Sequence, residues 1–139
     1  MNLGTHAIFD LVWRQEPCTP LLTNSFTFTE TMFETCDEAG ATVISFSEHK
    51  FGEGGFTYMF MLAESHASVH TYPEHGVAMF DIFTCGDVDA FKMMNSFLKK
   101  LEERQAKPDH TYQTNMYRGF VGSYKVIPME EEFNGRPNT

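Results

Sequence analysis

The sequence predicts a single α+β domain: a two-layer sandwich in which a mainly antiparallel sheet carries helices on one face. Its 139 residues suffice for one hydrophobic core but not for two. Hydrophobic residues make up 42% and charged residues 21%, as in ordinary globular domains, so an ordered fold is expected. β-rich runs follow one another between two helical segments, in the order β-α-β-β-β-β-α-β, and this succession favours antiparallel pairing.

The chain opens with a strand over residues 5–13, which the polar, proline-bearing stretch 15–20 closes. Asn24 or Ser25 is a suitable cap for the helix that follows, and Gly40 provides a stop signal after it. This helix is expected to end near Glu38, with these candidates for its buried side: Phe26, Met32, Phe33 and Cys36.

Two β-rich runs, 41–47 and 56–63, come next, separated by a glycine-rich turn at 52–55. The second run is apolar at nearly every position. Such a run indicates a strand covered on both faces or a short buried helix. Two further strands are predicted at 66–71 and 77–84, with a proline and a glycine between them.

The clearest helix covers residues 89–104, and Asp87 or Asp89 is placed to cap it. Its apolar residues at helical spacing are Met94, Phe97, Leu98 and Leu101. A last strand is predicted over 111–118, with another at 121–127.

Residues 1–128 are thus expected to form one domain, and 129–139 a flexible tail. One layer of helices leaves the second face of the sheet uncovered, and that face is also apolar in places. We therefore expect this face, or an edge of the sheet, to meet a second subunit in a homodimer.

The composition argues against several classes of protein. A net charge of -9 disfavours nucleic acid as a partner, because its phosphates are bound through Lys and Arg. No apolar run is long enough to span a bilayer, and no basic segment leads into an apolar run as in a signal peptide. Three cysteines without CxxC spacing are poor evidence for disulfides or structural zinc. These features predict a cytoplasmic protein without a membrane partner.

Polar groups of catalytic type are concentrated in residues 64–75, and Cys85 follows soon after. Three histidines lie in this stretch: His66, His70 and His75. One interpretation is nucleophilic catalysis, with Ser65, Ser68 or Cys85 activated by a histidine. A second is a metal site formed by His66, His70 and Cys85. The third is an ordinary strand whose polar groups have local hydrogen-bond partners.

The order and spacing of the motifs favour one family. Residues 62–74 read Leu-Ala-Glu-Ser-His-Ala-Ser-Val-His-Thr-Tyr-Pro-Glu, and residues 81–86 read Asp-Ile-Phe-Thr-Cys-Gly. This pattern resembles the signature of the small prokaryotic S-adenosylmethionine decarboxylases. That signature has Glu-Ser-His at a cleavage point, then His-Thr-Trp-Pro-Glu, then Asp-x-Phe-Thr-Cys-Gly. Length and element order agree with this family over roughly residues 3–128.

The resemblance implies a proenzyme that cleaves itself between Glu64 and Ser65 into chains 1–64 and 65–139. Ser65 would become a pyruvoyl group, the cofactor, which forms a Schiff base with the substrate amine. The implied activity is decarboxylation of S-adenosylmethionine for spermidine synthesis, by a homodimer of cleaved protomers.

The same resemblance implies roles for single residues. The hydroxyl of Ser65 would attack the carbonyl carbon of Glu64, and His70 would remove the Cα proton of Ser65. Cys85 matches the proton donor of decarboxylation. Thr57 stands where the family has a serine that supports processing. Ser65 and His70 are five residues apart, so strand alternation places them on opposite faces, and the mechanism demands a bend or bulge between them.

Substrate binding is implied by position for Phe51 and Tyr72, the aromatic pair, and for Glu74, which would bind the ribose. Tyr72 replaces the usual Trp of the motif. An alternative is the same chemistry on ornithine or arginine. The distal cation of ornithine or arginine would need a carboxylate from one of three residues: Asp10, Glu53 or Glu74. A further alternative is an unprocessed, non-catalytic binding or regulatory homologue.

Overall fold

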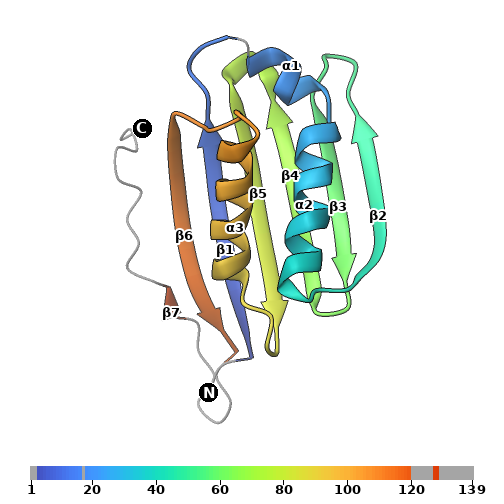
Figure 1. The fold of residues 1–139 in the computed structure, drawn as a ribbon, viewed down its shortest axis with the longest axis vertical. Helices are drawn as coiled ribbons and strands as arrows, with labels where there is room; N and C mark the ends of the chain where they lie inside the picture. Colours follow the sequence, from blue (N-terminus) through green and yellow to red (C-terminus); the bar gives the residue numbers. More distant parts are fainter. Residues whose placement is uncertain (1–2, 17, 120–126, 129–139) are drawn as a thin grey trace.

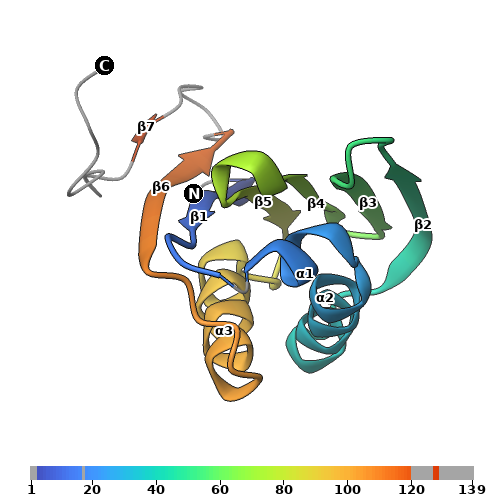
Figure 2. The ribbon, with the colours of Figure 1, turned by 90° about the horizontal axis from the view of Figure 1, so that it is seen from above.

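The structure, a computed structural model, describes residues 3–16, 18–119 and 127–128, which form one sheet with helices packed on one side (Figures 1 and 2). The seven strands lie in the order β2-β3-β4-β5-β1-β6-β7, and each neighbouring pair is antiparallel. Figure 2 shows α1, α2 and α3 on the same face. The predicted fold class is therefore confirmed.

The elements largely match those expected. The strands are β1 (Gly4–Val12), β2 (Val43–Lys50), β3 (Phe56–Leu62), β4 (Ser65–Tyr72), β5 (Val77–Cys85), β6 (His110–Arg118) and β7 (Ile127–Pro128). The helices are α1 (Cys18–Thr23), α2 (Phe26–Ala39) and α3 (Ala90–Glu103), with a short 3-10 turn, η1 (Pro73–His75), between β4 and β5. Of the strand predicted at 121–127, only residue 127 is described, in β7, and the predicted tail 129–139 lies outside the described residues.

The sequence does not predict helix α1, because Pro20 favours a loop over this segment. Proline is tolerated in the first turn of a helix, where the backbone N–H groups have no helical partner. Helix α2 begins and ends as predicted: Ser25 occupies its N-cap position, and Gly40 ends it with a φ of 76°, a left-handed conformation that glycine adopts at little cost.

The buried side of α2 differs from the prediction. Met32 and Cys36 are buried as expected, together with Phe28, whose ring contacts those of neighbouring core aromatics. Phe26, however, is 64% exposed, and Phe33 is also exposed. Residues 28, 32 and 36 are each four apart and define the stripe that faces the sheet, and Phe26 lies outside it. Phe33 borders this stripe, because its ring, although partly exposed, contacts the rings of Phe60 in β3 and Phe46 in β2 at centroid distances of 4.7 and 5.7 Å.

The apolar run at 56–63 is strand β3 rather than a helix, but the helices cover only one of its faces. Its buried residues alternate along the strand and lie beneath the helices: Phe56, Tyr58, Phe60 and Leu62. Met59 and Met61 point to the opposite side, and Met61 is 56% exposed. We call this side, opposite the helices, the open face. Met79 of β5 is exposed there as well. The open face is thus apolar in part, as predicted.

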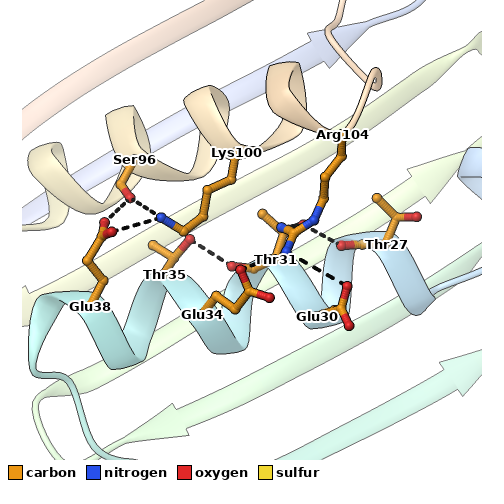
Figure 3. Close-up of polar contacts among 9 residues, drawn as sticks. All are labelled: Thr27, Glu30, Thr31, Glu34, Thr35, Glu38, Ser96, Lys100 and Arg104. Atoms are coloured by element: carbon orange, nitrogen blue, oxygen red, sulfur yellow. Dashed lines mark hydrogen bonds and ion pairs between the residues drawn. The ribbon is translucent and has the colours of Figure 1, made fainter.

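The two long helices are joined across their outer surface (Figure 3). At the end of α3, Arg104 donates a hydrogen bond to Thr31 Oγ1 at 2.6 Å and pairs with Glu34 at 2.7 Å. One turn earlier, Lys100 pairs with Glu38 at 3.0 Å. The exposed pairs contribute about 0–1 kcal/mol each, so burial of the aromatic core is the larger stabilising term. None of the described helices is long and apolar enough to cross a membrane.

Candidate active site

Ser65, the first residue of β4, has a φ of 152°. A residue other than glycine rarely adopts such a backbone conformation, and the strain of holding it there costs about 1–3 kcal/mol. Among the described residues, only Gln105 shares a positive φ without being glycine. The strained residue in the sheet is therefore the serine at which the sequence predicts cleavage.

The peptide bond before Ser65 is held by hydrogen bonds to Glu64. The carbonyl oxygen of Glu64 accepts a hydrogen bond from the backbone N–H of Cys85 at 3.1 Å. Its carboxylate accepts one from the backbone N–H of Thr42 at 3.0 Å. The thiol residue Cys85 is itself exposed. We call Glu64, Ser65 and Cys85 the cleavage end.

A second group of predicted residues gathers at the other end of β4. Thr57 of β3 and His70 of β4 are cross-strand partners, and Thr57 Oγ1 lies 2.9 Å from His70 Nδ1. Both line an open cavity of about 240 Å³. Its wall also includes the three residues expected to bind substrate: Phe51, Tyr72 and Glu74. These five residues are the pocket end.

Of the carboxylates proposed for a basic amino acid, Glu53 and Glu74 line this cavity, whereas Asp10 lies on β1 and is not part of its wall. The rings of Phe51 and Tyr72 are both partly exposed at the cavity. Aromatic faces accept a flat heterocycle by stacking and attract a cation.

The structure does not bring the two ends together within one chain. From Ser65 to His70, all described, β4 pairs with both β3 and β5 without any shift of register. Five residues of regular strand separate Ser65 from His70 by about 17 Å. The bend or bulge expected between them is therefore absent, because unbroken ladders on both sides keep the strand extended.

Between the two ends, the open face carries a network centred on Asp81 of β5. Asp81 Oδ2 accepts hydrogen bonds from His6 Nε2 at 2.8 Å and from His66 Nε2 at 3.1 Å. Ser68 donates to Oδ1 of the same carboxylate. Arg118 Nη1 lies 3.3 Å from His6 Nδ1. The residues of this Asp81 network come from four strands.

The hydrogen bonds of the network alter its pKa values. Burial by itself raises the pKa of Asp81, but the hydrogen bonds from His6, His66 and Ser68 outweigh it and bring the pKa far below its ordinary value. The hydrogen bond to Asp81 raises the pKa of His66, against a smaller opposing effect of burial. Asp81 is thus a carboxylate at neutral pH.

The predicted metal set does not form. His66 and His70 are about 13 Å apart along a regular strand, too far to share one ion. The residues whose ligand atoms do lie within 4.8 Å of one another are His6, His66 and Asp81. Because a carboxylate only accepts, each histidine presents an N–H to it, and the Arg118 guanidinium stands beside His6. This arrangement favours a hydrogen-bond network over a metal site.

The sequence interpretation assigned no role to Asp81 or His6. Asp81 was noted only as part of the motif at 81–86. The sequence does contain a signal for Asp81: a charged residue in an otherwise apolar strand needs a hydrogen-bond or ionic partner when its face of the sheet is buried. The partners themselves lie on other strands and are set by the order of the sheet.

Known proteins resemble this chain in sequence and structure. Residues 6–113 match the sequence profile of S-adenosylmethionine decarboxylase. A relative from Brevibacillus brevis, named S-adenosylmethionine decarboxylase proenzyme, is 36% identical over 99 residues, which are 71% of each chain. One of the same name from Thermosipho melanesiensis is 41% identical over 105 residues, 75% of this chain and 78% of the relative.

A solved structure agrees with these sequences. The adenosylmethionine decarboxylase of Aquifex aeolicus superimposes with a TM-score of 0.73 and 30% sequence identity, covering 89% of this chain and 97% of the other. The family profile spans most of the described sheet and all three helices. The chain therefore belongs to the S-adenosylmethionine decarboxylase family.

Proposed function

We propose that this chain is a self-processing, pyruvoyl-dependent decarboxylase that converts S-adenosylmethionine to decarboxylated S-adenosylmethionine for spermidine synthesis. The observation that carries the proposal is the strained φ of Ser65 in a member of this family. The relatives are named proenzymes, which accords with maturation by cleavage. Strain at a functional residue is a recognised device for driving a reaction of the backbone.

Processing begins when Ser65 Oγ attacks the carbonyl carbon of Glu64. The C–N bond of the peptide breaks, the hydroxyl proton passes to the nitrogen, and an ester replaces the amide. Negative charge develops on the Glu64 carbonyl oxygen during the attack, and the Cys85 N–H at 3.1 Å is placed to stabilise it. Release of the strained φ favours the forward direction.

The ester then undergoes elimination. His70 takes the Cα proton of residue 65, the Cβ–Oγ bond breaks, and Glu64 leaves as the carboxylate end of chain 1–64. The resulting dehydroalanine tautomerises to an imine, and water hydrolyses it with loss of ammonia. Chain 65–139 is left with a pyruvoyl group, whose carbonyl supplies the electron sink that decarboxylation of an amino acid requires.

His70 reaches position 65 only if it comes from another chain, because about 17 Å separates the two residues along β4. The exposed methionines of the open face favour its burial. A twofold axis that lies in this face and crosses β4 between its ends would lay the cleavage end of one protomer against the pocket end of its partner. We therefore assign proton removal to the partner subunit's His70, with two such sites in each homodimer.

In turnover, Phe51 and Tyr72 of the pocket end hold the adenine and the sulfonium, and Glu74 binds the ribose hydroxyls. These assignments rest on the shared cavity and on the chemistry of aromatic and carboxylate groups. Cys85, exposed at the cleavage end, protonates the carbanion that loss of CO2 leaves.

The test measures release of labelled CO2 from carboxyl-labelled S-adenosylmethionine by the purified protein and two variants. Wild type should release CO2, Ser65→Ala should remain uncut and inactive, and Cys85→Ala should be cut yet nearly inactive. A fully active Ser65→Ala protein would refute the mechanism. Release from labelled ornithine or arginine, but not from S-adenosylmethionine, would refute the substrate.

A further inference from the structure

We propose that His66, anchored by Asp81, is a positioning residue for self-cleavage: it fixes the segment after the scissile bond so that Ser65 is kept in its strained conformation. This inference rests on the proposed function. It assigns a role in maturation to two residues of the open face that take no part in the steps described above.

Ser65 lies between two anchored neighbours. On one side, Glu64 is held through its carbonyl by Cys85 N–H and through its carboxylate by Thr42 N–H. On the other, His66 Nε2 donates to Asp81 Oδ2 at 3.1 Å. A strained backbone persists only where its surroundings over-determine it. The His66 contact is the side-chain anchor on the C-terminal side.

Asp81 is oriented independently of His66. Ser68 donates to its other oxygen, and His6 donates to Oδ2 at 2.8 Å. Arg118 in turn lies 3.3 Å from the other ring nitrogen of His6. The carboxylate is therefore fixed by β1, β4 and β6 as well as by its own strand, and serves His66 as a rigid acceptor.

Loss of the positioning effect of His66 can be distinguished from loss of global stability. The side chain of His66 is 38% exposed, and that of Asp81 is 26% exposed. Removing a half-exposed imidazole takes little apolar surface out of the core, so global stability should change little. Removing a hydrogen bond to a charged group that acts in the transition state of processing, in contrast, lowers the rate of self-cleavage by about 10–100-fold.

The experiment follows self-cleavage of freshly synthesised full-length precursor over time on denaturing gels, with and without hydroxylamine. Hydroxylamine splits an ester but not an amide under mild conditions, so it reports whether the acyl shift has occurred. The variants are His66→Ala, His66→Gln and Asp81→Asn. Glu38→Gln is the matched control, because Glu38 is a paired carboxylate on the helix layer whose partners, Ser96 and Lys100, belong to α3 and not to the contacts of Glu64, Ser65 or Asp81.

We expect His66→Ala and Asp81→Asn to cleave about 10–100-fold more slowly than wild type, with little extra product on adding hydroxylamine. His66→Gln should recover part of the rate, since its amide N–H can still donate to Asp81. In the uncleavable Ser65→Ala background, His66→Ala and His66→Gln should shift the melting temperature by only a few degrees.

Wild-type cleavage rates in His66→Ala and Asp81→Asn would overturn the inference. So would an equal loss in Glu38→Gln, or full product on adding hydroxylamine, which would place the defect after the acyl shift. Failure of the wild-type precursor itself to cleave would refute the proposed function and this inference with it.

Discussion

Complementation between two inactive variants tests whether each site combines residues of two chains. Ser65→Ala lacks the hydroxyl proposed to attack Glu64, and His70→Ala lacks the proposed base. If the chains pair at random and in equal amounts, about half of the dimers contain one of each. In such a dimer, one site has both mutations, and the other combines the intact Ser65 of one chain with the intact His70 of its partner.

The expected result follows from the separation of about 17 Å between these residues along β4. Coexpression should cleave up to about half of the His70→Ala chains and none of the Ser65→Ala chains, because every His70→Ala chain in a mixed dimer has a competent partner. Mass spectrometry of differently tagged chains gives both fractions. Absence of cleavage in mixed dimers shown to have formed would refute the two-chain site. Cleavage of His70→Ala expressed alone would remove the need for this base.

Four further predictions concern the Asp81 network, the turn at Gly76 and the core. Asp81 raises the pKa of His66, so an NMR titration of Ser65→Ala should place His66 above the ordinary histidine value, and adding Asp81→Asn should lower it. The His66–Asp81 pair stabilises the fold at pH values below the ordinary pKa of histidine, and this stabilisation is lost as the pH rises through the raised pKa of His66. Denaturant titrations at several pH values would show the loss. Gly76→Ala should destabilise the fold by at least about 2 kcal/mol, because φ of Gly76 is 67° and the new Cβ would lie 2.3 Å from the Trp13 carbonyl oxygen. An unchanged midpoint of urea unfolding would contradict this prediction. Phe28→Ala should lose about 3–5 kcal/mol on the same measurement, because Phe28 is fully buried among aromatic rings.

Local signals were sufficient for most elements of the fold. Ser25 and Gly40 mark the ends of α2, and Asp89 caps α3 by accepting from the N–H groups of Phe91 and Lys92, because capping depends on neighbours in sequence. Burial alternates along β3, but the exposed positions are methionines, so the sequence lacks the apolar–polar alternation that indicates a strand with one covered face.

The candidate site was predictable only in part. Motif spacing led to Ser65, His70 and Cys85, but not to their distances, since the path of β4 depends on ladders with both neighbouring strands. The contacts of Asp81 join residues from distant parts of the chain, and sequence patterns of short period carry no information about such contacts.

Intact mass spectrometry of the purified protein under denaturing conditions tests the central claim, self-cleavage before Ser65, most directly. Self-cleavage gives two fragments, 1–64 and 65–139, the second without a free amino terminus and with the mass of a pyruvoyl group in place of Ser65. A single uncut chain of 15.9 kDa would contradict it and would favour an unprocessed binding homologue.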